Sequence, residues 1–143
     1  MLKLSVIERN LLINKLTGAI IFLAIATTGF FYFVIGDNWN ASIWCFLLDV
    51  TCFSVLYFNF HMLQDKLQKF TKLTFTIIKF VALMLSLVGL VCTVTYTIIA
   101  AIREEKFHEQ RYYFAAIASA GSFFWSSVFF FDTRKYELCA EYF

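Results

Sequence analysis

One carboxylate, Asp49, lies inside a long apolar stretch and is the first residue of this sequence that could have a chemical role. The stretch runs from Ala41 to Leu63 and holds no other acidic residue and no lysine or arginine. As a helix rising about 1.5 Å per residue, it is long enough to cross a bilayer. An ionisable group at that depth costs about 2.5–3.5 kcal/mol on insertion scales and almost never faces lipid. We therefore predict neighbouring helices, with Asp49 directed at them.

The helix face of Asp49 and the residues at its depth define a predicted intramembrane polar site. Residues at intervals of three and four share its face and should point inward: Cys45, Cys52, Leu56 and Asn59. Counting from the helix ends places three hydroxyl groups at its level: Thr28, Thr93 and Ser119. Hydroxyls can donate to a carboxylate or accept from a carboxylic acid. Three interpretations stay open, namely a hydrogen-bonded structural contact, a site for a proton or cation, and direct catalysis.

The other reactive residues do not assemble into a site. His61 and His108 fall on opposite sides of the membrane in the expected topology, so they cannot share a metal. No phosphate-binding loop, catalytic triad or basic cluster with aromatic residues is present. We therefore expect no enzyme, no cofactor, no metal and no nucleic acid partner. Cys139 follows the last predicted helix on the cytosolic side and is a candidate for palmitoylation, with a free thiol as the alternative.

The composition of the chain is that of a membrane protein. Of its 143 residues, 61% are hydrophobic and 15% are charged, whereas soluble domains are about a quarter charged. Proline is absent, so long helices can continue without a break. These features predict an all-α integral membrane bundle, a single domain over residues 1–143, with helices at about 16–35, 41–63, 77–102 and 112–131. The short connections predict antiparallel neighbours.

The distribution of basic residues predicts the orientation of this bundle. Nine of the twelve lysines and arginines lie in the N-terminal segment, in the loop before the third helix together with Lys79, and in the C-terminal tail. Cytosolic loops carry such an excess. Both termini are therefore expected in the cytosol. Lys79, close to the start of the third helix, is expected to extend its ammonium group to the interface.

Small residues predict where helices approach one another closely, because lipid provides no hydrophobic drive for helix association. The predicted packing positions lie on the third and fourth helices and are Gly89, Thr93, Ala118, Gly121, Ser122 and Ser126. Packing within the bundle explains such a pattern, and a homodimer face is the alternative.

Three stretches carry a resemblance to a known family. The fourth helix opens with RYYFAAIASAGSFF at residues 111–124, small residues followed by aromatic ones, and the acidic and basic sequence DTRK follows at 132–135. The start of the first helix reads NKLTG at 14–18. With the four-helix layout and cytosolic ends, these stretches resemble the MARVEL-type tetraspan proteins, the group related to myelin-and-lymphocyte protein, physins and occludin. Asp49 is not a hallmark of that family.

The resemblance implies a non-enzymatic role in organising membranes at cell junctions, in membrane apposition or in vesicle traffic. The expected partners are the lipid bilayer, other integral membrane proteins and further copies of the chain, in the plasma membrane or an endomembrane. Two alternatives stand beside this function. One is a small accessory subunit of a larger membrane complex, such as a channel or an energy-transducing assembly. The other is a proton- or ion-binding transporter that uses Asp49.

Overall fold

The computed structural model describes residues 6–63, 71–103 and 111–141. Within these residues the chain forms four α-helices and no strand: α1 (Val6–Ile35), α2 (Trp39–Leu63), α3 (Lys72–Ile102) and α4 (Arg111–Glu141). The prediction of an all-α chain with four long helices is confirmed.

Each of the four helices is long and apolar enough to cross a membrane. The candidate spans are Ile7–Ile35, Trp39–His61, Lys72–Ile102 and Tyr112–Leu138. Large apolar side chains such as Ile35 and Phe80 are exposed, while Asn59, Ser119 and Thr133 are completely buried. This distribution is the inverse of that in a water-soluble protein, and it suits a bilayer environment. The four spans indicate a multi-pass membrane protein.

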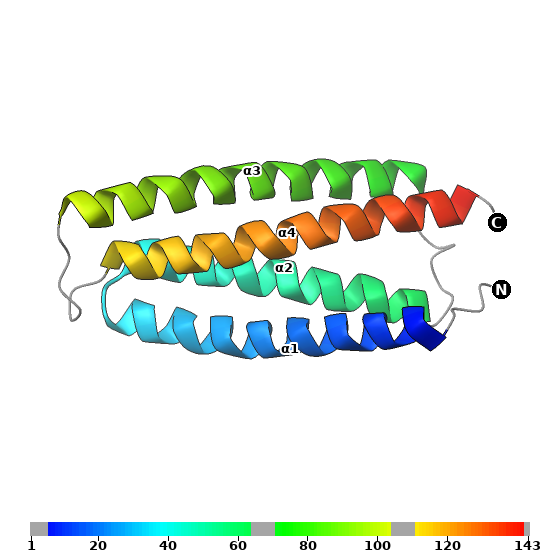
Figure 1. Cartoon of the computed structure of the whole chain (residues 1–143), viewed down its shortest axis with the longest axis horizontal. Coiled ribbons are helices and arrows are strands. Elements are labelled where there is room, and N and C mark those ends of the chain that lie inside the picture. The colour runs from blue at the N-terminus through cyan, green and yellow to red at the C-terminus, as the bar shows by residue number, and fades with distance from the viewer. Residues whose placement is uncertain (1–5, 64–70, 104–110, 142–143) are drawn as a thin grey trace.

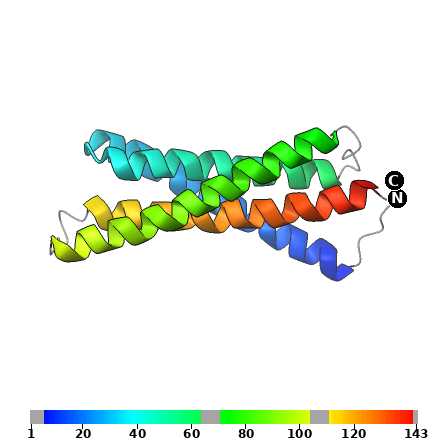
Figure 2. The same cartoon turned by 90° about the horizontal axis from the view of Figure 1, so that it is seen from above.

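The helices lie side by side in the order α3, α4, α2, α1, with consecutive helices antiparallel (Figure 1). Helix α4 packs on both α3 and α2, and α2 packs on α1. In the second view, α1 and α3 cross this central pair obliquely (Figure 2). The two central helices are accordingly the more buried. In an apolar stretch of 18 residues from each helix, 50% of the residues are buried in α2 and 44% in α4, against 11% in α1 and 17% in α3.

Helix α3 begins at Lys72, five residues ahead of the predicted start at residue 77, and two other helices exceed the prediction by more. Helix α1 already begins at Val6, ahead of the predicted start at residue 16, and α4 continues to Glu141, where a tail was expected after residue 131. Neither extension contains proline or glycine, so nothing in the sequence ends the helix there. Both extensions are also packed, because Leu12 of α1 and Tyr136 of α4 are buried.

Side-chain caps fix the starts of α2 and α3. The turn before α2 places Asp37 at a φ of 57°, a left-handed conformation that Asp tolerates better than most residues. Asn38 then accepts a hydrogen bond from the Ala41 backbone nitrogen at 3.3 Å. At the start of α3, the Thr71 hydroxyl accepts one from the Thr74 nitrogen at 3.2 Å. Such caps satisfy amide groups that the first helical turn leaves without partners.

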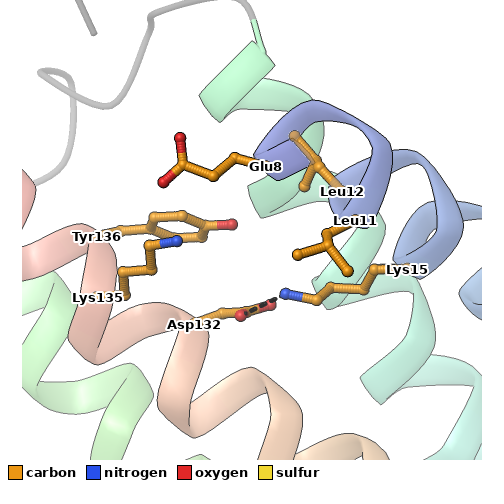
Figure 3. A pocket seen from close by; sticks show the side chains of 7 residues that line it. All are labelled: Glu8, Leu11, Leu12, Lys15, Asp132, Lys135 and Tyr136. Carbon is orange, nitrogen blue, oxygen red and sulfur yellow. Dashed lines mark hydrogen bonds and ion pairs between the residues drawn. The ribbon is translucent and has the colours of Figure 1, made fainter. Parts of the chain in front are cut away.

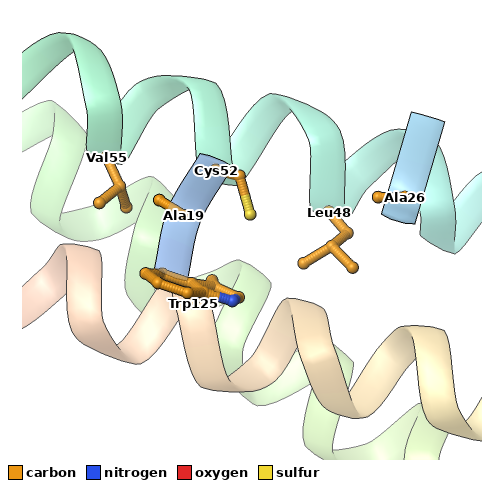
Figure 4. Packing of buried hydrophobic residues seen from close by; sticks show 6 residues of the cluster. All are labelled: Ala19, Ala26, Leu48, Cys52, Val55 and Trp125. Atoms are coloured by element: carbon orange, nitrogen blue, oxygen red, sulfur yellow. The ribbon is translucent and has the colours of Figure 1, made fainter. Parts of the chain in front are cut away.

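The apolar interior is built around Trp125 of α4. Its ring packs with Ala19 of α1 and with Leu48, Cys52 and Val55 of α2 (Figure 4). A second cluster joins α2, α3 and α4 through Phe58, Phe75 and Tyr136. Helix α4 therefore contacts all three other helices and positions the polar residues described next.

Candidate functional site

Asp49 receives one hydrogen bond that the structure describes, from the neighbouring helix α1. The Thr27 hydroxyl donates to Asp49 Oδ1 at 3.0 Å, and the same hydroxyl lies 2.9 Å from the Leu23 carbonyl oxygen. A hydroxyl has a single proton, so Thr27 divides it between these two acceptors. Were Asp49 protonated, it would donate to Thr27 while Thr27 donated to Leu23, and both contacts would be complete. The geometry thus leaves an ionised Asp49 short of donors.

Asp49 lies at the outer edge of the contact between α1 and α2. Its side chain is half-buried and its partner Thr27 is exposed. On α2 the residues that flank it, Phe46, Val50 and Phe53, are all exposed. Of the face predicted to point inward, Cys45, Cys52 and Asn59 are buried, and Leu56, like Asp49, is half-buried. The carboxyl group is consequently open on one side to whatever surrounds the bundle.

The hydroxyl groups predicted around Asp49 do not form one cluster, and this part of the prediction needs correction. Thr28 is exposed and donates to the Ala24 carbonyl oxygen at 2.9 Å. Thr93 and Ser119 bond to each other at 2.9 Å and join α3 to α4. Counting residues from a helix end gives depth but not direction, and consecutive helical residues such as Thr27 and Thr28 point about 100° apart.

The contact between α3 and α4 contains the first group of predicted packing residues. A Cβ atom placed on Gly89 would lie 3.2 Å from the Phe123 backbone nitrogen and 3.2 Å from the Ser119 carbonyl oxygen. Hydroxyl pairs lie along the same contact: Thr93 with Ser119 at 2.9 Å, and Ser86 with Ser127 at 2.8 Å. The two backbones thus approach closely at Gly89 because it has no side chain.

The contact between α4 and α2 contains the second group. A Cβ atom on Gly121 would lie 3.2 Å from the Leu48 methyl carbon Cδ2. Ser122 donates to the Trp44 carbonyl oxygen at 3.3 Å, and Ala118 packs in a cluster with the same tryptophan. Ser126 is completely buried, and its hydroxyl has no hydrogen-bond partner among the described residues. The predicted packing residues therefore divide between two helix contacts: those of α3 face α4, and Ala118, Gly121 and Ser122 of α4 face α2.

A second polar region lies at the end of the bundle where α1 begins and α4 ends. Lys15 of α1 forms an ion pair with Asp132 of α4, with Nζ 2.7 Å from Oδ1. The other oxygen of Asp132 accepts from Asn59 of α2 at 3.5 Å. Asn59 in turn accepts a hydrogen bond from the Tyr136 hydroxyl. We call these four residues, Lys15, Asn59, Asp132 and Tyr136, the end network, which links three helices.

The remaining helix is tied to the same end by a separate ion pair. Lys79 of α3 pairs with Glu137 of α4. The sequence predicts that Lys79 reaches the interface but not that it meets an acidic partner there. Because α4 supplies both Asp132 and Glu137, its C-terminal extension holds α1 and α3 electrostatically.

No protein-family model, curated protein or solved structure matches this chain. Its function is therefore inferred from its own contacts.

Two further predictions concern chemistry at the same end of the bundle. Cys139, the candidate for lipidation, lies in the last turns of α4, and its side chain falls outside the part of the chain that the structure describes. In residues 6–63, 71–103 and 111–141, no three or more histidine, cysteine or acidic side chains converge as metal ligands would.

Sequence reasoning did not identify the end network, although a signal for it was present. Lys15 directly precedes the uncharged run of the first helix, and Asp132 directly follows that of the fourth. In an antiparallel bundle of four helices, the start of the first and the end of the fourth lie on the same side. Lys15 and Asp132 therefore lie at the same depth in the membrane, where their opposite charges can pair.

Proposed function

We propose that this chain is a non-enzymatic membrane-organising protein that binds other transmembrane proteins laterally. Nearly all of the described chain belongs to helices that can span a membrane, so contacts within the bilayer are its main means of recognition. The MARVEL-type resemblance extends the proposal to cell junctions, membrane apposition or vesicle traffic, with both chain ends in the cytosol.

The position of Asp49 is the observation that carries this proposal. The carboxyl group lies in mid-span at the outer edge of the α1–α2 contact. Among the residues that the structure describes, it receives only part of one hydroxyl proton, from Thr27. No lysine or arginine occurs in the apolar runs of the four spans, at residues 16–35, 41–63, 80–102 and 112–131. Intramembrane acidic residues are typically paired with another polar or charged group. A partner helix that brings a lysine or arginine to this edge would complete the contact.

Site-specific cross-linking tests this proposal directly. A photoreactive amino acid at Phe53, which is exposed beside Asp49, is expected to capture a defined transmembrane protein in cells. The same probe at Ile117 of α4, which is also exposed, serves as the control position. Introducing Asp49→Leu should abolish the Phe53 product, whereas the conservative neighbouring change Val50→Leu should retain it. An unchanged Phe53 product in the Asp49→Leu protein would refute the proposed role of this edge.

The same observation favours a second candidate, a small accessory subunit of a larger membrane complex. An acidic residue that needs an external partner also suits permanent assembly with one large protein. Stoichiometry separates the two: purification in mild detergent should yield one equimolar large partner for an accessory subunit. A membrane organiser should yield several partners, or oligomers of the chain itself.

A further inference from the structure

Asp49 has different surroundings on its two sides. Toward α1 its carboxyl group contacts the Thr27 hydroxyl, with 3.0 Å between Thr27 Oγ1 and Asp49 Oδ1. On the other side, the neighbouring Phe46 and Phe53 side chains are exposed, so this side of the carboxyl group opens toward lipid. The hydrocarbon layer contains no water to solvate a polar group. The charge of Asp49 must therefore be balanced by a protein group or removed by a proton.

The helices around Asp49 supply no opposite charge. Helix α2 packs on α1 and α4, and α4 packs on α3. The apolar runs of these three neighbours, at residues 16–35, 112–131 and 80–102, contain no acidic or basic residue and no histidine. The titratable groups of these runs, and of the face of α2 that carries Asp49, are thiols and phenols: Cys45, Cys52, Cys92, Tyr32, Tyr96, Tyr112 and Tyr113. None of them can carry a positive charge.

Asp132, by contrast, has a cation. Figure 3 shows the ammonium group of Lys15 directed at its carboxylate, with Nζ 2.7 Å from Oδ1. Asp132 also lies on the wall of a partly open hollow, at the position where the apolar run of α4 ends. This carboxylate can therefore stay ionised, whereas Asp49 lies in mid-span without a cation among the residues that the structure describes.

Protonation of Asp49 completes both hydrogen bonds of the Thr27 hydroxyl. This hydroxyl lies 2.9 Å from the Leu23 carbonyl oxygen as well as 3.0 Å from Asp49, and it has one proton to donate. A carboxylic acid donates its own proton to Thr27, whose proton then goes wholly to Leu23. A carboxylate has no proton to donate, and an unpaired ion in an apolar environment is in practice neutralised. The geometry thus favours the neutral acid in the isolated chain.

We propose that Asp49 is a neutral carboxylic acid in the isolated chain and transfers its proton to a lysine of the partner helix when that helix docks. This inference rests on the proposed function and specifies the partner residue. A lysine amine loses its charge readily in an apolar environment, whereas arginine stays protonated, so both partners can enter the membrane uncharged. On docking, the O–H bond of Asp49 breaks and an N–H bond forms on the lysine nitrogen. The products are a carboxylate and an ammonium group, and no other reactant is needed.

Infrared spectroscopy of the full chain in an ester-free detergent at neutral pH tests the protonation. The wild-type spectrum minus that of Asp49→Asn should contain a carboxylic acid carbonyl band, which heavy water shifts. Asp37→Asn is the matched control, because Asp37 is exposed in the turn before α2 and asparagine also tolerates its φ of 57°. The control difference should contain a carboxylate band only. A carboxylate band without an acid band for Asp49 would overturn the proposal.

Designed transmembrane peptides test the proton transfer. A polyleucine helix with one central lysine should bind the wild-type chain and remove the acid band, whereas the same helix with leucine at this position should do neither. Asp49→Asn should lose binding of the lysine helix, and Val50→Leu, a change at an exposed neighbour, should retain it. Circular dichroism checks that each variant keeps its helices. An acid band that persists in the bound complex would overturn the transfer, and an arginine helix that binds as tightly as the lysine helix would overturn the choice of lysine.

The outcomes distinguish this inference from the proposed function. A partner cross-linked at Phe53 in cells, together with an ionised Asp49 in the isolated chain, would overturn the inference and leave the lateral partner in place. An acid band with no Phe53 product in cells and no binding of the lysine helix would overturn both, because the acid would then have no partner to receive its proton.

Discussion

Lys15 and Asp132 are 117 positions apart in the sequence, yet their charged groups lie 2.7 Å apart and close the bundle between its first and last helices. The side chain of Asp132 is only 11% exposed and that of Lys15 is 31% exposed. Asp132 also accepts a hydrogen bond from the buried Asn59. The burial of this ion pair is intermediate between that of an exposed surface pair and that of a fully buried pair. The free-energy cost of breaking it should therefore also be intermediate.

Removing one charge of this pair should destabilise the bundle. Lys15→Met keeps most of the aliphatic chain but leaves Asp132 without its cation. Exposed pairs are worth about 0–1 kcal/mol and breaking a buried pair costs about 3–5 kcal/mol, so we expect a loss of about 1–3 kcal/mol. Unfolding in detergent measures it. In a double-mutant cycle, adding Asp132→Leu should cost much less in the Lys15→Met protein than in the wild type. Additive costs would show that the pair contributes no coupling.

Two glycine-to-alanine changes should differ in their cost because their surroundings differ. At Gly89 the new methyl group would meet backbone atoms of Ser119 and Phe123 at 3.2 Å, and these cannot move without separating the helices. At Gly121 it would meet the end of the Leu48 side chain, which can rotate away. Overpacking that cannot be relieved costs about 1–3 kcal/mol.

We therefore expect Gly89→Ala to lower the midpoint of thermal unfolding clearly, and Gly121→Ala to lower it less. Val91→Leu, on the exposed surface of α3, is the control and should have little effect. A Gly121→Ala protein that is less stable than Gly89→Ala would contradict the assignment of the closest backbone contact to α3 and α4.

The sequence predicts the number and type of the helices because their signal is strong and local. Apolar runs of bilayer length identify each span, and the absence of proline permits continuous helices. The extensions of α1 and α4 are not predicted, because charged residues such as Glu8 and Lys135 mark the end of an apolar run without ending a helix. Their helical state depends on contacts between residues far apart in the sequence, such as Lys15 with Asp132.

At the candidate site, too, the sequence identifies the unusual residue but not its contacts with other helices. The sequence identifies Asp49 correctly as an unusual residue, since a carboxylate in an apolar run is visible without a structure. It does not identify Thr27 as its partner, because the rotation of α1 against α2 depends on close contacts such as that of Gly29 with Cys45. The sequence also places Thr93 and Ser119 at the depth of Asp49, but it does not show that these two hydroxyls bond to each other between α3 and α4.

The orientation inferred from charge remains a prediction with a direct test. The start of α1 and the end of α4 lie at one end of the bundle (Figure 1), so tags at Met1 and Phe143 should share one side of the membrane. The excess of basic residues at this end predicts that it faces the cytosol. Both tags should therefore be protected from antibody in intact cells, while a tag inserted after Glu105 should be accessible. Surface labelling of either terminus would contradict this orientation.

Substitutions of Asp49 can distinguish a role in folding from a role in binding a partner. In Asp49→Asn the amide can donate to the Thr27 hydroxyl while that hydroxyl donates to Leu23, so the internal hydrogen bonds are complete without a charge. We expect the folding stability to change little, because hydrogen bonds in membranes average about 0.6 kcal/mol. Thr27→Val, which removes the donor, should cost a similarly small amount. Unfolding in detergent checks both expectations.

Asp49→Asn should reduce the yield of the cross-linked product from Phe53, although it leaves the folding stability almost unchanged. A partner lysine or arginine loses its counter-charge in this variant, so the product should decrease strongly although the protein remains folded. Asp49→Leu should abolish the product, because it removes both the charge and the hydrogen-bonding atoms of this side chain. A folded Asp49→Asn protein that cross-links as well as the wild type would show that the partner contributes no charge there. Asp49 would then act through neutral hydrogen bonds within the α1–α2 contact.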